Sequence, residues 1–402
     1  MAMNHWADSS LNEEHSGKEL ERVGQYRQAL DRILYQAIKD GCSDVHMTAQ
    51  GEVWVRNKVG DLVPMVINGK PFRLTPGAAR ETILSCLGQD ENVNSRRRLL
   101  QELIDARELD LAYTLRTAEG EERFRINLYH TLPNQLRAAF RWLPSKIRTV
   151  QELGLPANII ELAQAPRGLV LVCGPTGSGK STTLASMIDY INKTRHAHII
   201  TIEDPVEYIH KSQQCLVSQR EVGKDTNSFA RALRAALRED PDVILVGEMR
   251  DPETISLAIT AAETGHLVLS TLHTQDASQT IDRIIDSFPA AQQNQIRAQL
   301  SLTLVGVVVQ TLLRKRDGTG RTVACEVMTG KHPVPAQIRD GKTHLLYGTI
   351  QTGKANGMQT MEQALAELVA KGTIDVATAF ERTSRPDDLQ LELNKFGQVV
   401  AS

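Results

Sequence analysis

Apolar positions over residues 25–144 follow a helical period in some stretches and a strand pattern in others. Residues 25–39 carry apolar side chains three or four positions apart, which predicts an amphipathic helix, and similar patterns cover 76–87 and 95–104. Short apolar runs predict strands at 53–56, 62–67, 111–115, 124–129 and 136–142. We therefore predict a mixed α/β module over residues 25–144, preceded by a polar, flexible tail at 1–24.

The pattern changes after an irregular, proline-containing segment at 145–156, which we interpret as a linker. Continuous apolar runs then alternate with helical patterns, as expected of parallel strands that helices cover on both faces. These runs are 169–173, 199–202, 243–246 and 267–271. We predict an α/β core over 157–289 and a mostly helical region over 290–402. The apolar run 300–313 is too short and too often interrupted to span a bilayer, so we expect a buried helix there.

Composition narrows the functional classes. The 402 residues include 46 basic and 48 acidic side chains, and the net charge of -2 gives no sign of nucleic acid or an anionic membrane as a partner. The N-terminus has no basic start followed by an apolar run, so we expect a cytoplasmic protein. The five cysteines include no Cys-x-x-Cys pair, which argues against a zinc ribbon or a disulfide framework.

The strongest chemical signal is a glycine-rich loop between an apolar run and a helical pattern. It fits the Walker A form Gly-x-x-x-x-Gly-Lys-[Ser/Thr], with the sequence Gly174-Pro175-Thr176-Gly177-Ser178-Gly179-Lys180-Ser181. Glycines let backbone N–H groups turn toward phosphate, and the helix N-terminus adds positive potential. Lys180 is expected to reach the β- and γ-phosphates, and the Ser181 hydroxyl to ligate Mg²⁺. We assign this loop and Thr182 to the binding of ATP with Mg²⁺.

Two acidic segments accompany the loop. The apolar run 243–246 leads into Glu248, and a strand of this kind places a carboxylate beside the phosphates. The run 199–202 leads into Glu203, with Asp204 and Glu207 close behind, a cluster that is costly unless a cation or a strong donor is shared. Glu203 and Glu248 are alternative candidates for activating the attacking water.

The order of these motifs resembles a known family. A histidine-containing segment with His266 and His273 follows the Leu-Val-Gly-Glu-Met-Arg-Asp strand. Phosphate loop, acidic segment, this strand and the histidine segment together resemble the secretion ATPase superfamily of type II and type IV secretion and of pili. Within it, the chain is most similar to the PilT-type retraction motors. The resemblance extends over residues 25–385, and the further segments that support it are 41–46, 124–127, 140–145, 166–169, 234–242, 280–284 and 350–353.

The resemblance implies a PAS-like N-terminal α/β domain followed by a RecA-like P-loop ATPase domain, assembled as a homo-hexamer that powers pilus retraction. It implies that His266 and His273 sense or orient the γ-phosphate. Arg125 and Arg141 match positions where the family's N-terminal domain supplies arginines to nucleotide, and Arg137 is a weaker third candidate. The implied partners are an inner-membrane pilus platform protein and other pilus motors, at the inner face of the cytoplasmic membrane.

Other functions stay open. Extension motors of the superfamily are longer at the N-terminus and carry a four-cysteine zinc motif, which this chain lacks. A PilU-like accessory retraction paralogue and a DotB-like type IV secretion or conjugation ATPase are alternatives. A RecA-like motor on nucleic acid would need basic loops or stacking aromatics, and aromatic residues make up only 4% of the chain. A non-hydrolysing, nucleotide-gated scaffold would be expected to lack the acids found here.

One segment departs from the family's pattern. Where retraction motors carry Ala-Ile-Arg-Asn-Leu-Ile-Arg-Glu, this chain has Pro333-Val334-Pro335-Ala336-Gln337-Ile338-Arg339-Asp340. Only the second arginine remains, as Arg339, and the two prolines are expected to disfavour the start of a helix. We expect ATP hydrolysis to be retained and its coupling to retraction to be weakened.

Overall fold

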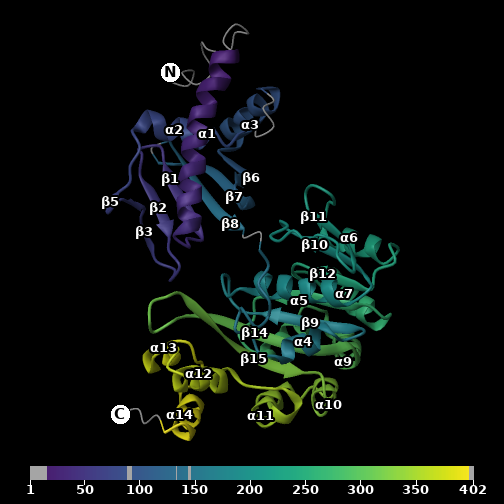
Figure 1. The fold of residues 1–402 in the computed structure, drawn as a ribbon. Helices are drawn as coiled ribbons and strands as arrows, with labels where there is room; N and C mark the ends of the chain where they lie inside the picture. The colour runs from purple at the N-terminus through teal and green to yellow at the C-terminus, as the bar shows by residue number, and fades with distance from the viewer. Residues whose placement is uncertain (1–15, 88–92, 133, 144–145, 398–402) are drawn as a thin grey trace. The chain divides into compact units, whose positions relative to one another are not determined.

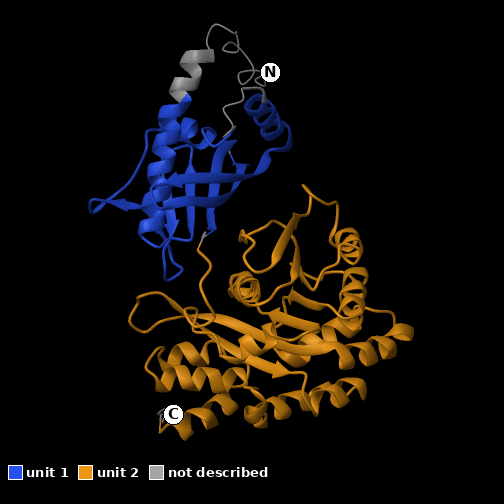
Figure 2. Cartoon of the chain, turned by 45° about the vertical axis from the view of Figure 1, so that its right-hand side comes forward, with its two compact units in different colours: residues 1–145 blue, residues 146–402 orange. Residues whose placement is uncertain are grey.

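The chain divides into two compact units, Met1–Ser145 and Lys146–Ser402, which Figure 2 shows in blue and orange. The computed structural model describes residues 16–87, 93–132, 134–143 and 146–397 (Figure 1). An antiparallel sheet organises the first unit and a mainly parallel sheet the second. The predicted α/β class, with a sheet domain ahead of a parallel-sheet ATPase-type domain, is confirmed.

Helices cover one face of the sheet in the N-terminal unit. The six strands, in spatial order, are β3 (Leu62–Pro64), β2 (Val53–Arg56), β1 (Asp44–Thr48), β8 (Gln135–Leu143), β7 (Gly120–Thr131) and β6 (Glu108–Thr117). Phe124, Ile126 and Phe140 point into a core that they share with Leu30 and Leu34 of α1 (Ser16–Lys39). The remaining elements are α2 (Pro76–Leu84), α3 (Val93–Ala106), β4 (Val66–Ile67) and β5 (Lys70–Pro71).

The predicted helices and strands of residues 25–144 are present, with two additions, β1 and the two-residue strand β5, and one correction. The interior strand β1 was not expected, because its segment is short and only two of its five residues, Val45 and Met47, are apolar. The predicted tail is wrong for residues 16–24, which belong to the first turns of α1. Residues 1–15 lie outside the described part of the chain.

Helices cover both faces of a seven-stranded sheet in the C-terminal unit. Along the sheet lie β11 (Leu216–Glu221), β10 (His198–Glu203), β12 (Val243–Val246), β13 (Leu267–Leu272), β9 (Gly168–Cys173), β14 (Leu304–Arg314) and β15 (Arg321–Thr329). Neighbouring strands are parallel except for the antiparallel pair β14–β15. Leu169 and Leu171 face one core, whereas Val170 and Val172 face the other, so β9 is buried on both sides.

The two cores are closed by different helices. One contains side chains of α6 (Phe229–Ala236), α7 (Pro252–Glu263), α8 (Ala277–Asp286) and α9 (Ala290–Thr303), and the other those of α4 (Asn158–Ala163) and α5 (Lys180–Thr194). A separate cluster joins the far end of the β14–β15 hairpin to C-terminal helices. The C-terminal elements are α10 (Val334–Arg339), η2 (Thr343–Leu345), α11 (Leu346–Thr352), η3 (Lys354–Asn356), α12 (Met361–Ala370), α13 (Val376–Phe380) and α14 (Pro386–Lys395).

The expectation of a buried helix over 300–313 is wrong. Helix α9 ends at Thr303, and β14 begins at the next residue and pairs with both β9 and β15. The run is rich in valine, which favours strands, and a short apolar run is compatible with either structure. Residues 290–402 are therefore not a helical appendage, because they supply two strands of the central sheet.

The segment predicted as a linker, 145–156, contains no helix or strand in its described part. It is nevertheless anchored, because Val150 and Leu155 are buried in the core that α4 and α5 close. None of the helices in the described ranges combines the length and the apolar character needed to cross a bilayer. All five cysteines are buried as free thiols.

The prolines at 333 and 335 do not prevent a helix. Pro333 is the N-cap of α10 and Pro335 lies in its first turn. The first N–H groups of a helix have no intrahelical acceptor, so proline costs little there. The expectation that these prolines disfavour a helix start is wrong, and Arg339 remains in the last turn of α10.

Glu326 links β15 to the start of α8. Its Oε1 accepts a hydrogen bond of 2.7 Å from the backbone N–H of Ala277, and the side chain is buried. The N-terminus of a helix favours an acceptor of this kind. Burial nevertheless raises the pKa of Glu326 to about 7, from an ordinary value of 4.5.

Stability is expected to fall as pH rises, because folded Glu326 keeps a proton that the unfolded chain loses. This contribution is fully present below pH 4.5 and is lost as pH rises through about 7. Glu326→Gln should therefore show a flatter dependence of the thermal unfolding midpoint on pH between 5 and 8. Glu381→Gln, at an exposed position, is the control and should keep the wild-type slope. An unchanged slope in Glu326→Gln would contradict this account.

Candidate functional site

The carboxyl ends of four neighbouring parallel strands meet at one edge of the C-terminal sheet. Strands β10, β12, β13 and β9 lie in that order and run in the same direction. Glu203 ends β10, Glu248 and His273 follow β12 and β13 closely, and the glycine-rich loop begins at Gly174 after β9. The sheet order therefore brings motifs that lie up to a hundred residues apart to a common edge, where ligands bind in open α/β sheets.

The glycine-rich loop adopts backbone conformations that favour glycine. Gly174, Gly177 and Gly179 have φ angles of 137°, 79° and 91°. Lys180 begins α5, and its Nζ donates to the carbonyl oxygens of Gly174 and Pro175 at 2.9 and 3.1 Å. Burial lowers the pKa of Lys180, and its electrostatic interactions, including those with Glu248 and Glu207, oppose that shift. The loop thus holds a lysine amine at the positive end of a helix.

Hydroxyl groups of α5 lie beside the acidic segment. Ser181 lines a cavity of about 40 Å³ together with Glu203 and Thr271. The hydroxyl groups of Thr182 and Tyr208 share a hydrogen bond of 2.9 Å, which ties the helix to the segment after β10. This combination of hydroxyl and carboxylate oxygens is the donor set that Mg²⁺ prefers.

The two candidate carboxylates have different surroundings. Glu203 accepts hydrogen bonds from Thr201 Oγ1 at 2.7 Å and Gln219 Nε2 at 3.4 Å, and burial still raises its pKa. Glu248 forms an ion pair of 2.5 Å with Arg250 Nε and lies 3.8 Å from His273 Nε2. Glu203 ends β10 and Glu248 lies two residues beyond the end of β12, and both remain candidates for activating water.

The structure separates the two predicted histidines. His273 follows β13 at the carboxyl edge, where burial and the charge of Lys180 lower its pKa. A neutral ring can then act as donor and acceptor near Glu248. His266 precedes β13 and its Nδ1 lies 2.9 Å from the carbonyl of Ala261, so the whole strand, on the order of 20 Å, separates it from that edge. The expectation that His266 senses the γ-phosphate is wrong for the loop of its own chain.

Arg125 and Arg141 are cross-strand neighbours on the exposed face of the N-terminal sheet. Like charges directly opposite repel each other, and two aspartates offset this repulsion. Arg141 Nε donates to Asp44 at 2.9 Å, and Arg125 Nε lies 3.8 Å from Asp110. The arginine side chains are 47% and 63% exposed, for Arg125 and Arg141 respectively, so they can bind an external anion. Arg137 lies four residues before Arg141 on the same face of β8.

Several polar residues of the site were missed from the sequence. Tyr208 and Gln219 position the helix and Glu203, and Thr271 donates to the carbonyl of Gly247 at 2.6 Å. Gln310 is buried in β14 and contacts the glycine-rich loop. The available signal was a polar residue inside an apolar run, since a buried amide needs partners.

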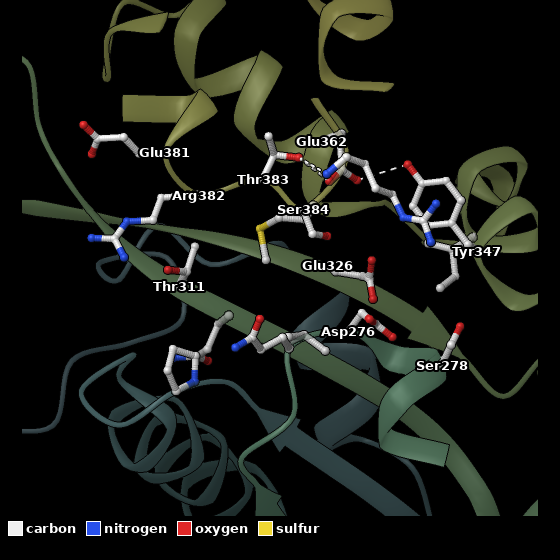
Figure 3. Close-up of a pocket in the computed structure, with 17 residues that line it drawn as sticks. Asp276, Ser278, Thr311, Glu326, Tyr347, Glu362, Glu381, Arg382, Thr383 and Ser384 are labelled. Carbon is white, nitrogen blue, oxygen red and sulfur yellow. Dashed lines mark hydrogen bonds between the residues drawn. The ribbon is translucent and has the colours of Figure 1, made fainter. Parts of the chain in front are cut away.

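A larger cavity of about 380 Å³ borders the loop at Pro175 (Figure 3). The carboxylates of Asp276, Glu326 and Glu362 line it, and the Tyr347 hydroxyl donates to Glu362 at 3.1 Å. Arg382 and Arg385 line it as well, so its lining is mixed in charge. We place the phosphates at the glycine-rich loop, because its N–H groups and the N-terminus of α5 favour an anion.

Comparison with known proteins gives consistent results. Residues 19–371 match the family described as type II/IV secretion system protein. The Pseudomonas aeruginosa protein named type IV pilus retraction ATPase PilT is 45% identical over 363 residues, which cover 89% of this chain and 99% of PilT. The type IV pilus ATPase PilU of the same organism is 38% identical over 90% of each chain. A twitching motility protein of Neisseria gonorrhoeae is 50% identical over 70% of this chain and 74% of its own.

Solved structures show the same fold. The crystal structure of the pilus retraction motor PilT with bound ADP has a TM-score of 0.76 and 44% identity, and covers 90% of this chain and 98% of that chain. The Legionella pneumophila ATPase DotB also has a TM-score of 0.76, with 26% identity over 88% of this chain and 95% of its own. PilT is thus more similar in sequence than PilU or DotB, which supports the retraction motors over the two alternatives.

Replacing Glu248 with glutamine is expected to preserve ATP binding and to slow hydrolysis by about 100-fold or more, since the charge is lost and the volume kept. Turnover and nucleotide affinity of purified protein are the measurements. Glu203→Gln is the matched variant at the end of β10. Wild-type turnover in Glu248→Gln, together with a large loss in Glu203→Gln, would assign the water-activating role to Glu203 instead.

Proposed function

The chain belongs to the type II/IV secretion system protein family, and on that basis we propose that it is an ATP-hydrolysing motor that powers the retraction of type IV pili. The observation that carries the proposal is the 45% identity with a pilus retraction ATPase over nearly the whole of both chains. The site supports it, because a phosphate loop, two acids and a histidine meet at one sheet edge. PilU-like and DotB-like functions are the alternatives. The chain is 38% identical to PilU and 26% identical to DotB, which is less than its identity with PilT.

ATP binding rests on the loop and the first turn of α5. Loop N–H groups bind the phosphates, and Lys180 leaves its two loop carbonyls to meet the β- and γ-phosphates. Ser181 and the carboxylate of Glu203, which line the same small cavity, are oxygen donors that fit Mg²⁺. When bound, Mg²⁺ neutralises charge that develops on the phosphate oxygens.

Hydrolysis requires a water molecule that is oriented and deprotonated beside the γ-phosphate. Glu203 or Glu248 accepts its proton, and each is held by neighbouring donors. His273 lies near Glu248, and its lowered pKa favours the neutral imidazole. The single N–H of that neutral ring donates a hydrogen bond to the γ-phosphate.

We extend the proposal to a ring of six chains in which the N-terminal unit of one chain supplies arginines to the phosphate loop of another. Its support is the exposed pair Arg125 and Arg141, which lies in a different compact unit from the loop. An arginine that reaches the transferred phosphate is a large electrostatic contribution to phosphoryl transfer. The motor would act at the inner face of the cytoplasmic membrane on a pilus platform protein, alongside other pilus motors.

Expression of this chain in a strain that lacks its pilus retraction motor is expected to restore retraction, observed directly on labelled pili. Lys180→Ala at equal abundance should not restore it, because the charge over the phosphates is lost, and it should lack ATPase activity while remaining folded. ATP hydrolysis by the wild-type chain without any restored retraction would overturn the retraction role and leave the ATPase assignment standing.

Mixed rings test the shared site. Arg141→Ala and Lys180→Ala chains are each expected to be nearly inactive, and mixing them should restore part of the ATPase activity. Some interfaces then combine an intact loop with an intact arginine pair. Two distinguishable tags verify that subunits exchange. An Arg137→Ala chain mixed with the Lys180→Ala chain serves for comparison. No rescue despite verified exchange would argue against a site shared between chains.

A further inference from the structure

Gln310 of β14 joins the glycine-rich loop to the helix that follows it. Its Nε2 donates to the carbonyl of Ser178 at 2.6 Å, and its Oε1 accepts from Thr183 Oγ1 at 2.9 Å. The side chain is only 1% exposed. Both polar atoms of the amide are therefore hydrogen-bonded, Nε2 to the loop and Oε1 to the first turn of α5.

The loop backbone also lies directly against β14. A Cβ atom added to Gly174 would lie 2.3 Å from the backbone oxygen of Gln310, which no residue with a side chain can accommodate without a shift. A Cβ at Gly179 would lie 3.1 Å from Gln310 Nε2. The glycines at these two positions thus allow contact with Gln310 in addition to their positive φ angles.

The bond to Ser178 sets the direction of one N–H group. The carbonyl that Gln310 holds belongs to the peptide between Ser178 and Gly179. In a trans peptide the C=O and N–H point in opposite directions. When Gln310 holds the oxygen, the N–H of Gly179 points away from β14, toward the side of the loop on which phosphate binds.

An apolar residue at position 310 would be cheaper to bury. An amide costs free energy in a core unless every polar atom finds a partner, and the neighbouring β14 residues Val308 and Val309 are apolar. Without the amide, the Ser178 carbonyl would lose this hydrogen bond, and the orientation of its peptide would be less restrained. Burying the amide costs free energy, and its structural effect is to fix the orientation of the Ser178–Gly179 peptide.

We propose that Gln310 is a positioning residue for nucleotide, which fixes the Ser178–Gly179 peptide with its N–H toward the β-phosphate. The inference rests on the proposed ATPase function. Gln310 touches no phosphate itself and acts through the loop.

The test compares Gln310→Leu with Thr183→Val in the full-length protein. Both remove the bond to Thr183, and only Gln310→Leu also removes the bond to Ser178. We expect Gln310→Leu to weaken ADP binding about 10-fold or more, the loss of roughly one hydrogen bond to a charged group. Thr183→Val should weaken it less than about 3-fold. Thermal unfolding measures the structural cost of each substitution separately.

A pH profile supplies a readout that a merely structural role would not move. In Gln310→Glu, the introduced carboxyl can donate to the Ser178 carbonyl only when it is protonated. ADP affinity of this variant should therefore approach the wild-type value at about pH 6 and fall as pH rises, because deprotonation sets two acceptors against each other.

The outcomes separate the inference from the proposed function. Wild-type protein that neither binds ADP nor hydrolyses ATP would overturn the proposed function. Wild-type activity together with equal ADP affinity in Gln310→Leu and Thr183→Val would overturn the positioning role alone. A Gln310→Glu variant whose ADP affinity, relative to wild type, does not change with pH would also overturn it.

Discussion

The contact between the glycine-rich loop and its neighbouring strand is the constraint on which the site depends. A loop that surrounds phosphate must expose its N–H groups on one side and satisfy its carbonyls on the other. The side chain of Gln310 satisfies the Ser178 carbonyl, and the backbone of β14 packs against the loop at Gly174. The position of β14 beside β9 is in turn fixed by hydrogen-bonded register along both strands. The chemistry at the sheet edge therefore depends on a strand that contains none of the catalytic motifs.

The charged side chains of interest are buried to different extents in the two compact units. In the C-terminal unit, Glu203 and Lys180 are partly buried and hydrogen-bonded to neutral groups at one edge of the sheet. In the N-terminal unit, Arg125 and Arg141 lie opposite each other on the adjacent strands β7 and β8, and much of each side chain is exposed to solvent. Surface ion pairs with aspartates contribute little to stability, so a negatively charged ligand can compete for these arginines.

Functional residues that belong to a short contiguous motif could be predicted from the sequence. Lys180 and Ser181 follow from a motif between a strand and a helix, and the parallel strands from continuous apolar runs. The prediction for 300–313 was wrong because a short apolar run fits a strand as well as a helix. His266 was misplaced because two histidines close in sequence lie at opposite ends of one buried strand. Gln310 escaped notice because its partners lie more than a hundred residues away.

The length of β14 has a mechanical consequence. Gln310 lies three positions before Leu313, which packs in the cluster that α12, α13 and α14 form. Three residues of a strand span on the order of 10 Å, and the antiparallel partner β15 braces that stretch with paired backbone hydrogen bonds. A braced strand of this length resists bending, so it behaves as a short strut between the phosphate loop and the last three helices. The segment 333–340, with its altered arginine motif, branches off beyond β15 and is not part of that strut.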